Sequence, residues 1–487
     1  MLTIPSHTRV LVIGGGPAGA TAAGLLARQG FDVTLLEQSY FPRYHIGESL
    51  LPSILQILDL LGARERMEKF GHQVKHGAFL EWGRESWPLN FGELGGNRTY
   101  AFQVTRSEFD QMLLDHAASV GARVFQGIEV RSLTFDTQGR PICAQWQQKM
   151  KADEQPGAEG EISFDFLIDA SGRSGIMATH YLRNRRYHKV FQNIAIWGYW
   201  ENADRLATGR EGDIAVSSIP HGWLWAIPLS DGKMSVGVVM HRDAVNAKKS
   251  LGMEEIYHQA IADSKMVKKI VQNATMVSGI LNEADYSYTS EQFSGPGYFM
   301  CGDAACLLDP LLSSGVHLAT FSAMLSAACI TSLESGEITE SEAISFFEKS
   351  YRQAYLRFLV FLSAFYDVNR GRDAYFWEAQ KLTQEDVDSN TLKLAFLSLV
   401  TGLKDLSDAQ RDTHNMILKE MANRINENLN LRKDKDTLAT LEGERLAQAR
   451  ANANFFSSIE GLFSLNREEA IDGLYISTEP RLRVARA

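Results

Sequence analysis

The segment that most constrains the fold lies near the N-terminus, in residues 9–37, RVLVIGGGPAGATAAGLLARQGFDVTLLE. An apolar run, a glycine loop, a helical pattern and a second apolar run follow one another within the length of one βαβ unit. The glycines of such a loop allow a tight turn, close approach of a pyrophosphate and close packing of the helix. The segment therefore predicts a dinucleotide site with the phosphates at the helix N-terminus. The loop residues assigned to this site are Gly14, Gly16, Pro17, Ala18 and Gly19.

An acidic residue, Glu37, ends the second apolar run, about twenty residues after the loop. Its carboxylate can accept hydrogen bonds from ribose hydroxyls and would repel a phosphate on the ribose, which favours an unphosphorylated adenosine. Two later segments, 164–175 (FDFLIDASGRSG) and 297–324 (GYFMCGDAACLLDPLLSSGVHLATFSAM), also have the pattern of a strand followed by a Gly-containing turn. We expect these three separated parts of the chain to converge on one cofactor.

Alternating strand patterns fill much of the region between these segments. In residues 222–240, GWLWAIPLSDGKMSVGVVM, the pair Asp231-Gly232 predicts a hairpin that joins two antiparallel strands. After about residue 325 the pattern becomes helical, and Thr339 and Glu342 have the spacing of a capping box. A buried helix face is predicted for an aromatic and apolar stripe at three- and four-residue spacing. The stripe comprises Phe347, Tyr351, Tyr355, Phe358, Leu359, Leu362 and Tyr366.

Charge and composition exclude several classes of function. A formal net charge of -10 and a pI near 5.7, without a basic stripe, argue against a nucleic-acid partner. The four cysteines lack metal-ligand spacing, so no metal site or disulfide framework is expected, and they suit a reducing compartment. The longest apolar stretch, 358–366, is too short to span a bilayer, and the N-terminus has no signal pattern. We expect a cytoplasmic protein that does not contact a membrane.

The stretch WLWAIP, residues 223–228, places two tryptophans two positions apart. In a strand, Trp223, Trp225 and Ile227 would share one face, and Pro228 would follow them as the strand ends. Paired tryptophans on one face of a strand are most often ordinary sheet-packing residues. The context of the pair, rather than the pair itself, indicates a further role.

The combined motifs resemble those of known flavoproteins. GGGPAG, Glu37, DASGR (169–173) and CGDAA (301–305) resemble the motifs of FAD-dependent monooxygenases. WLWAIP matches the WxWxIP pattern of flavin-dependent halogenases, and Lys75 in VKHGAFLEWG matches their lysine. The resemblance covers nearly the whole chain and is closest to the phenol- and pyrrole-type halogenases of natural-product biosynthesis.

This resemblance implies an α/β fold with additional α+β elements. A Rossmann-like FAD-binding domain, an antiparallel-sheet substrate domain and a helical C-terminal region are expected. The FAD-binding module occupies 1–330, built from discontinuous segments (about 1–75, 100–180 and 285–330), with the substrate domain inserted at about 76–99 and 181–284 and the helical region at 331–487.

The resemblance also implies which residues surround the flavin. Gly47, Glu48 and Ser49, together with Arg106 of TRSEFD, are expected beside it. Without the resemblance, an ion pair of Arg106 with Glu108 or Asp110 on the surface would be the simpler interpretation. A helix that starts near Ser314 would direct its positive end at the flavin ring. Further cofactor residues are Gly302, Asp303 as a partner of the ribityl chain, Pro310, Gly315 and Val316, and the halide site comprises Ser314 and Gly315.

The loop PLLSSG (310–315) departs from the tryptophan halogenases, whose matching loop reads Pro-Leu-Glu-Ser-Thr-Gly. Leu312 stands where they have a glutamate and can neither orient hypohalous acid nor act as a base. Free tryptophan is therefore not expected as the substrate. The phenol- and pyrrole-type enzymes have a Phe, Pro, Ser, Gly pattern, of which Pro310, Ser313 and Gly315 match while Leu307 replaces the aromatic residue.

The implied reaction uses reduced FAD, O2 and chloride or bromide to make hypohalous acid. Lys75 would hold this oxidant, by a hydrogen bond or as a chloramine, beside a phenolic, tyrosyl-type substrate that is free or bound to a peptidyl carrier protein. Trp223, Trp225, Ile227 and Pro228 would wall the flavin from the substrate. A single dinucleotide fingerprint indicates a separate NAD(P)H-dependent flavin reductase. The alternatives are an FAD-dependent aromatic hydroxylase and a non-enzymatic flavin-binding redox protein.

Overall fold

The computed structural model describes residues 3–82, 85–91, 100–149, 157–188, 191–248, 250–284, 287–368, 467 and 470–487. A first sheet contains the N-terminal strand and has the neighbour order β19-β20-β10-β1-β2-β7, with β9 beside β10 and β8 beside β9. The neighbours from β20 to β7 are parallel, which confirms the Rossmann-like fold. The strands are β1 (His7–Ile13), β2 (Val33–Glu37), β7 (Arg123–Gln126), β8 (Ile128–Phe135), β9 (Pro141–Gln148), β10 (Glu159–Asp169), β19 (Ser294–Gly295) and β20 (Tyr298–Met300).

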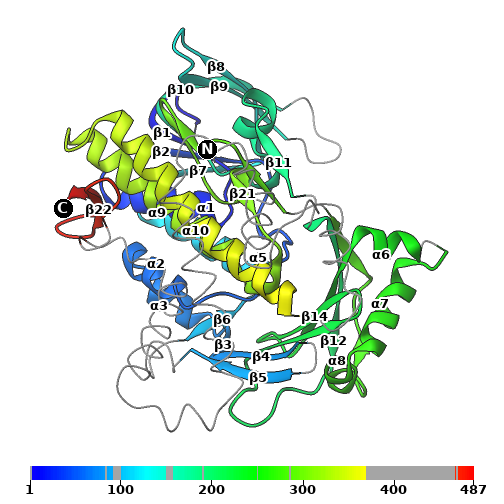
Figure 1. Cartoon of the computed structure of the whole chain (residues 1–487). Helices are drawn as coiled ribbons and strands as arrows, with labels where there is room; N and C mark the ends of the chain where they lie inside the picture. The colour runs from blue at the N-terminus through cyan, green and yellow to red at the C-terminus, as the bar shows by residue number, and fades with distance from the viewer. Residues whose placement is uncertain are drawn as a thin grey trace, which may run out of the picture.

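Helices α1 (Pro17–Arg28) and α5 (Arg106–Ser119) pack against this sheet, and α9 (Ser314–Glu334) packs against α1. Gly24 on α1 makes room for the last residue of α2 (Ile54–Leu61), since a Cβ atom built on it would lie 2.9 Å from Cδ2 of Leu61. Helix α9 runs through the centre of the molecule beside α1 and α10 (Glu340–Val368) (Figure 1). By length and composition α9 could cross a membrane, but 94% of its apolar window is buried inside the protein. Its apolar composition is explained by this core position.

A second sheet has the neighbour order β16-β12-β15-β14-β13-β4-β5, with β17 also beside β12. Its neighbours are antiparallel as expected, except for β4 and β13, which are parallel. Parallel pairing is possible because these two strands come from distant parts of the chain and need no hairpin. The strands are β4 (Gly77–Trp82), β5 (Glu85–Asn90), β12 (Asn193–Glu201), β13 (Ile214–Ile219), β14 (Gly222–Pro228), β15 (Met234–His241), β16 (Thr275–Met276) and β17 (Leu281–Ala284).

Strand β14 is buried on both faces, and its two faces pack into different cores. Trp223, Trp225 and Ile227 join the large core that contains the first sheet. Leu224 and Ala226 join a second core, which is covered by α6 (Arg242–Ala247), α7 (Met253–Asp263) and α8 (Lys265–Ile270) on the outer side of the sheet (Figure 1). The tryptophans therefore face inward, and the hairpin at Asp231-Gly232, with Gly232 at a φ of +87°, is confirmed.

The domain boundaries expected from the sequence stay a prediction.

Short helices, strands and turns lie along the chain between the strands of the two sheets. These connecting elements are α2 (Ile54–Leu61), α3 (Arg64–Lys69), β3 (Gln73–Lys75), β6 (Ala101–Gln103), β11 (Arg185–Tyr187), β18 (Tyr288–Ser290), β21 (Cys306–Leu307), the 3₁₀ turns Gly172–Ser174, Gly302–Ala304 and Pro310–Leu312, and the π-helical turn Ile176–Tyr181.

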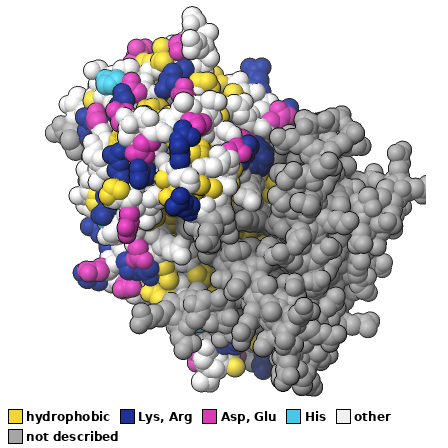
Figure 2. Space-filling view, turned by 60° about the vertical axis from the view of Figure 1, so that its left-hand side comes forward, with side chains coloured by type: hydrophobic (Ala, Val, Ile, Leu, Met, Phe, Trp, Pro, Cys, Tyr) yellow, Lys and Arg dark blue, Asp and Glu magenta, His cyan; other side chains and the backbone are white. Residues whose placement is uncertain are grey.

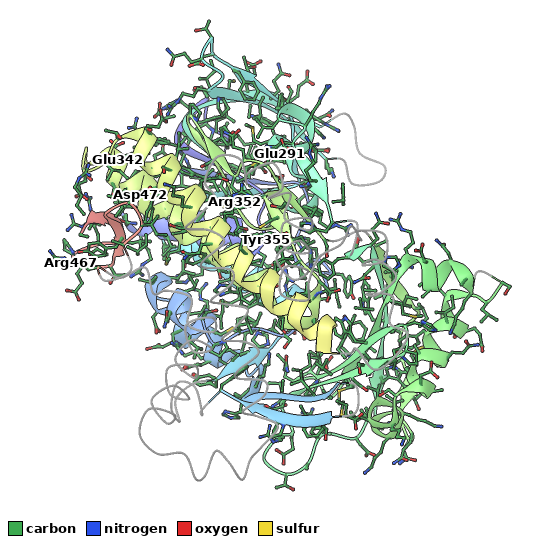
Figure 3. All side chains as sticks on the ribbon, viewed as in Figure 1. Glu291, Glu342, Arg352, Tyr355, Arg467 and Asp472 are labelled. Carbon is green, nitrogen blue, oxygen red and sulfur yellow. The ribbon has the colours of Figure 1, made fainter. Side chains whose placement is uncertain are left out.

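Helix α10 begins with the predicted capping box, in which the Thr339 amide donates to Glu342 at 2.8 Å and the Glu342 amide donates to the Thr339 hydroxyl at 3.3 Å. The described side chains of its aromatic and apolar stripe are buried, and that of Tyr366 lies outside the described residues. Arg352 donates from α10 to the carbonyl oxygen of Glu291 at 3.0 Å (Figure 3). This contact helps to fix the helix against the rest of the protein.

The C-terminal end is a two-stranded hairpin, β22 (Leu474–Ser477) and β23 (Arg483–Arg486), which the expectation of a helical region did not include. It lies beside α9 and α10 (Figure 1), where the Ser332 hydroxyl exchanges two 2.9 Å hydrogen bonds with the backbone of Val484. Lys349 of α10 forms an ion pair with Asp472 just before the hairpin. Tertiary contacts with the two helices stabilise a hairpin too short to be stable alone.

On the face shown in Figure 2, Lys and Arg side chains alternate with Asp and Glu side chains over the described surface. Several of the basic and acidic side chains form ion pairs, among them Arg140 with Glu340 at 2.7 Å and Arg483 with Glu337 at 2.9 Å.

Candidate functional site

The predicted site residues from different parts of the chain meet at Gly47, Glu48 and Ser49, which we call the GES segment. Gly47 accepts a hydrogen bond from Arg106 at 3.2 Å through its carbonyl oxygen. The Glu48 side chain accepts one from Tyr199 of the second sheet, and the Ser49 hydroxyl accepts one from Lys75 at 2.9 Å. The backbone is fixed as well, because the Val104 amide donates to Glu48 at 2.7 Å. The three partners come from α5, from the second sheet and from β3, so no one of these elements could hold the segment alone.

The glycine loop has the geometry that a bound pyrophosphate requires. Gly14 has a φ of +102°, and a Cβ atom on it would lie 2.2 Å from the Ala170 carbonyl oxygen. A Cβ atom on Gly19 would lie 1.9 Å from the Gly14 carbonyl oxygen. Above Gly16 the nearest atom is the Arg43 guanidinium, 3.3 Å from a built Cβ atom. The loop is closed towards the protein and bounded on its other side by a cation, so these residues fit an anionic dinucleotide.

Glu37 is buried at the end of β2, as expected. Its carboxylate accepts hydrogen bonds from the Gly15 amide at 2.6 Å and from the Ser39 amide at 2.7 Å. These two bonds orient the carboxylate and leave further acceptor positions on both oxygens. The side chain can therefore receive ribose hydroxyls without reorganisation.

Arg106 is not on the surface, and the partner it finds is Asp110. Its Nε and Nη2 atoms donate to the two Asp110 oxygens at 2.8 and 3.0 Å, and both side chains are buried. Burial alone would lower the pKa of Arg106, but Asp110 outweighs it and raises the pKa above its usual value. Nη1 donates to the Ile46 carbonyl oxygen at 2.7 Å. The ion pair was expected only as an alternative on the surface, and here it orients the arginine that holds the loop before Glu48.

Asp303 lies in the 3₁₀ turn Gly302–Ala304, between the end of β20 and the loop before α9. Its side chain is partly exposed, and its carbonyl oxygen accepts a 2.7 Å hydrogen bond from Tyr288. Desolvation raises the pKa of the Asp303 carboxyl to about 6, although the charges of Arg106 and two further arginines oppose this rise. The backbone is therefore held by Tyr288, and the nearby arginines favour the ionised form of the carboxyl.

The loop before α9 contains the expected halide residues. Ser313 adopts a left-handed conformation, with φ of +56°, immediately before the helix, and no side chain caps the first turn. Ser314 is buried, whereas a Cβ atom built on Gly315 would meet no atom within 4 Å. The positive helix end is thus open at Gly315, as an anion site would require, whereas the neighbouring Val316 is buried.

Sequence reasoning missed what holds this loop in place. Asp309 is buried and accepts a 3.1 Å hydrogen bond from the Leu311 amide, which fixes the 3₁₀ turn Pro310–Leu312. Its other oxygen accepts from the Asn193 side chain of β12 at 2.8 Å. The loop is therefore linked to the second sheet. An Asp before Pro is a typical turn residue, but only the fold reveals its partner.

The two tryptophans of WLWAIP form part of a larger aromatic group. The ring centres of Trp223 and Trp225 lie 5.8 Å apart, and Trp197 of β12 lies 6.4 Å from Trp225. Gly237, directly opposite Trp225 on β15, makes room for the indole, since a Cβ atom there would lie 2.1 Å from it. Sequence reasoning missed Trp197, whose partner strand could not be identified from the linear pattern.

Lys75 ends β3 and is buried, with only 2% of its surface exposed. Its ammonium donates to the Ser49 hydroxyl at 2.9 Å and to the Leu50 carbonyl oxygen at 3.0 Å. It also lies 5.2 Å from the centre of the Phe91 ring. A buried lysine is rare and is normally fixed by such partners. The surface position that is common for lysines is therefore ruled out.

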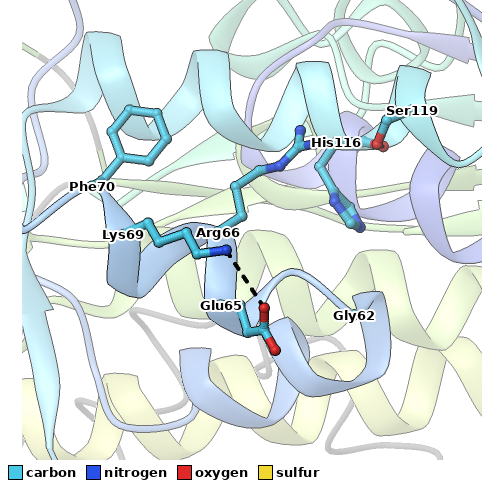
Figure 4. A pocket seen from close by; sticks show the side chains of 7 residues that line it. All are labelled: Gly62, Glu65, Arg66, Lys69, Phe70, His116 and Ser119. Atoms are coloured by element: carbon cyan, nitrogen blue, oxygen red, sulfur yellow. Dashed lines mark hydrogen bonds and ion pairs between the residues drawn. The ribbon is translucent and has the colours of Figure 1, made fainter.

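A surface pocket of about 620 Å³ lies elsewhere, between α2, α3 and α5 (Figure 4). It contains the exposed Lys69–Glu65 ion pair, whose charged atoms are 3.6 Å apart, and none of the predicted site residues lines it. We assign it no part in the reaction. The aromatic-rich segment 365–382 resembles that of phenol-type halogenases, which implies either a cover that narrows the substrate entrance or packing of a helix. It lies outside the described residues except for the backbone of the last turn of α10.

Comparison with known proteins identifies the family to which this chain belongs. The family model "Tryptophan halogenase" matches residues 9–99 and 96–405. A tryptophan 2-halogenase from Chondromyces crocatus is 42% identical, and the match covers 100% of this chain and 95% of that protein. The flavin-dependent halogenase armH3 of Armillaria mellea is 35% identical over 98% of this chain and 97% of its own length.

Solved structures agree with these sequence relatives. The myxobacterial chondrochloren halogenase CndH, a variant of FAD-dependent halogenases, is 36% identical with a TM-score of 0.73, covering 86% of this chain and 97% of its own. The flavin-dependent halogenase CmlS is 30% identical with a TM-score of 0.71, covering 88% and 79%. These matches favour a halogenase over the two alternatives from the sequence, an FAD-dependent aromatic hydroxylase and a non-enzymatic flavin-binding redox protein. The chain belongs to the tryptophan halogenase family and is a flavin-dependent halogenase.

Proposed function

We propose that this enzyme makes hypohalous acid at its flavin site and uses Lys75 to deliver the halogen to an electron-rich aromatic ring. The position of Lys75 carries the proposal. It is buried and is joined through Ser49 to the GES segment, whose other contacts reach Arg106 and the second sheet. Halogen transfer and cofactor binding would thus share one rigid segment while using different side chains.

The glycine loop and Glu37 would hold the adenosine and pyrophosphate parts of FAD, and Asp303 would hold the ribityl chain. Arg43, which lies above Gly16, would add a cation beside the phosphates. Bound reduced FAD supplies the reaction with O2 that oxidises a halide. The backbone amides of Gly315 and Val316, at the start of α9, would bind that halide.

Lys75 would hold hypohalous acid by donating a hydrogen bond to it, or would form a chloramine after losing a proton. The group of Trp223, Trp225 and Trp197 would separate the flavin from the aromatic substrate, so that oxygen is transferred to halide and not directly to carbon. Ser49 and the Leu50 carbonyl oxygen orient the ammonium and limit its motion. This positioning would direct the halogen to one ring atom.

The relatives and the loop before α9 favour different substrate rings. The tryptophan 2-halogenase relative favours an indole, because it is 42% identical over the whole chain. Leu312, which is partly buried and apolar, lacks the carboxylate that would assist reaction on a less activated ring and so favours a strongly activated ring such as a phenol. Position 2 of indole lies on its electron-rich pyrrole ring, so an indole halogenated there is compatible with Leu312. We therefore propose an activated ring, either an indole or a phenol.

Three further parts of the proposal concern partners and location. Flavin-dependent halogenases generally use a separate flavin reductase, and this chain has one convincing dinucleotide fingerprint, at Gly14 to Gly19. Rapid bleaching of bound FAD by NADH alone in stopped-flow mixing would contradict the need for a reductase. Presentation of a tyrosyl or related group by a peptidyl carrier protein, and a cytoplasmic location, remain parts of the proposal.

The decisive experiment supplies chemically reduced FAD, O2 and either chloride or bromide to the purified enzyme. Free tryptophan, tyrosine, a small phenol and a carrier-loaded tyrosyl thioester are compared by mass spectrometry of the products. Halogenation of an indole or phenol supports the proposed ring class, and halogenation of neither contradicts it. Product from the free compounds but none from the thioester contradicts carrier presentation.

A further inference from the structure

A line of hydrogen bonds runs from an exposed tyrosine to a buried carboxyl group in the GES segment. The Trp197 indole nitrogen donates to the Tyr44 hydroxyl at 2.6 Å. The hydroxyls of Tyr44 and Tyr199 lie 2.9 Å apart, and the Tyr199 hydroxyl donates to Glu48 Oε1 at 2.7 Å. All three distances are in the range of good hydrogen bonds. Neither tyrosine belongs to any motif of the cofactor loop or of the halide loop.

The donors along this line have one consistent direction. An indole nitrogen can only donate, so the Tyr44 oxygen accepts from Trp197. The single hydroxyl proton of Tyr199 is directed to Glu48, so Tyr199 must accept from Tyr44. Tyr44 therefore donates inward, towards Tyr199. Each hydroxyl along the line therefore donates its hydrogen bond in the direction of Glu48.

The two ends of the line differ in exposure. Tyr44 is 53% exposed, whereas Glu48 is 3% exposed. Tyr199 lies between them, partly buried on β12, with its ring edge-on to that of Tyr44. The line therefore links accessible surface to the interior. Its inner end lies beside Ser49, which accepts the hydrogen bond from Lys75.

We propose that Tyr44, Tyr199 and Glu48 form a proton-transfer chain that supplies the interior of the active site. This inference deepens the proposed formation of hypohalous acid and rests on it. In an inward step the Tyr199 O–H bond breaks and a Glu48 O–H bond forms. The Tyr44 hydroxyl proton passes to the Tyr199 oxygen, and solvent returns a proton to Tyr44. Both tyrosines end unchanged, and Glu48 holds one additional proton.

The reaction of the family needs such a proton. Reduced FAD in its neutral form, O2, a halide ion and one proton give oxidised FAD, hypohalous acid and water. The flavin is oxidised and the halide loses two electrons, while O2 takes up all four. Because the halide carries its negative charge into the site, the proton balances both atoms and charge. The later transfer of halogen from hypohalous acid to an aromatic C–H bond releases water and consumes no further proton.

The surroundings of Glu48 suit a group that gains and loses a proton near neutral pH. Burial raises the pKa of Glu48 to about 7, whereas hydrogen bonding by Tyr199 and the charge of Arg106 on α5 oppose the rise. The Ser235 hydroxyl on β15 also stabilises the ionised form, and the Asp231 carboxylate in the turn before β15 disfavours it. A proton carrier works best when its pKa lies near the operating pH.

The first test follows Glu48 itself in the FAD-loaded enzyme. The infrared carbonyl band of its protonated carboxyl group is assigned by its absence in Glu48→Gln. In the wild type this band should disappear with a midpoint near pH 7. In Tyr199→Phe the midpoint should rise, because the ionised carboxylate has lost a donor. A band that is absent at all pH values above 5, or a midpoint that Tyr199→Phe leaves unchanged, overturns the proposal.

The second test measures halide-dependent proton uptake with an indicator dye during a single turnover without aromatic substrate. Tyr199→Phe should slow uptake about 100-fold, the smaller end of typical proton-transfer contributions, and enlarge the solvent isotope effect. Tyr257→Phe is the matched control. It removes the hydroxyl of Tyr257, a fully buried tyrosine of α7, which accepts from Trp200 and donates to the Val236 carbonyl oxygen instead of Glu48.

Tyr44→Phe decides the question if Tyr199→Phe does not bind FAD, because Tyr44 is exposed and its replacement should fold. Wild-type uptake rates in both tyrosine variants overturn the proton chain. Absence of halide-dependent uptake in the wild type contradicts the proposed halogenase reaction instead. The infrared titration does not depend on that reaction, so the two failures are distinguishable.

Discussion

The glycine loop and the GES segment both lie beside the expected cofactor, but they are built in different ways. The loop is fixed by contacts within one unit, where Gly14 and Gly19 leave no room for a side chain. The GES segment is fixed by side chains from elsewhere, namely Arg106, Tyr199 and Lys75. Backbone contacts within the first sheet therefore shape the proposed cofactor site, and side-chain contacts from other parts of the chain shape the proposed site of halogen transfer. The predictions below test this difference.

The largest effect is expected for Gly19→Ala. Its Cβ atom would lie 1.9 Å from the Gly14 carbonyl oxygen, so the loop must move. We expect a loss of about 3 kcal/mol in the free energy of unfolding, together with loss of FAD binding. Denaturant unfolding and FAD titration measure the two effects. Gly279→Ala, where a Cβ atom meets no atom within 4 Å, is the control, and equal behaviour of the two variants would contradict the prediction.

Lys75→Met should separate the two regions. It removes the ammonium from the Ser49 hydroxyl but keeps an unbranched side chain of nearly the same length and changes nothing in the glycine loop. We expect halogenation to fall at least about 100-fold, the effect of removing one well-positioned donor, while FAD affinity and O2 consumption stay near wild type. Product formation and oxygen uptake are measured side by side. Halogenation at the wild-type rate would disprove the role of Lys75.

Glu48→Gln should change the pH dependence of stability. The unfolded protein loses the Glu48 proton near pH 4.5, but the folded protein keeps it until about pH 7. Glu48 therefore makes its full contribution to the free energy of unfolding below pH 4.5. About 3 kcal/mol of this contribution is lost as the pH rises to 7. Glutamine cannot ionise, so the variant should gain relative to wild type over this range in denaturant unfolding.

Two histidines also make the stability of the protein depend on pH, and comparing the variant with the wild type removes their effect. Burial lowers the pKa of His72 to about 4, and the charge of Arg106 with burial lowers that of His45 to about 4. Their contribution to stability is lost as pH falls below their unfolded values, which is the opposite sign. Because both histidines are present in wild type and Glu48→Gln, their effects cancel in the difference. An unchanged difference between pH 5 and 8 would contradict the assigned state of Glu48.

The smallest effect is expected for Gly237→Ala, which acts from outside the GES segment. The new methyl group would lie 2.1 Å from the Trp225 indole across the strand pair, so the ring must shift. We expect a loss of about 2 kcal/mol in stability. O2 consumption should become less coupled to halogenation, because the aromatic group no longer separates the flavin from the substrate. The ratio of halogenated product to O2 consumed is the measurement, and a wild-type ratio would weaken the proposed role of the tryptophans.

The residues missed by sequence analysis share one property. Arg43, Trp197, Tyr199 and Asn193 lie outside recognisable motifs, and each acts on a partner far along the chain. Trp197 and Tyr199 share a strand face, but the strand pattern NIAIWGYWE does not reveal that this face reaches Tyr44. By contrast, the face shared by Trp223 and Trp225 follows from a spacing of two residues.

The sequence by itself determined the Rossmann-like fold, the cofactor loop, the hairpin at Asp231-Gly232 and the capping box of α10. These features depend on backbone sterics and on side chains within a few residues of one another, so the linear pattern contains them. The tertiary structure alone decided that Arg106 pairs with buried Asp110, that Lys75 bonds Ser49, and that Glu48 receives a line of hydroxyls from Tyr44. Those choices depend on which distant surfaces are buried together, because burial makes an unpaired charge costly and so selects the partners.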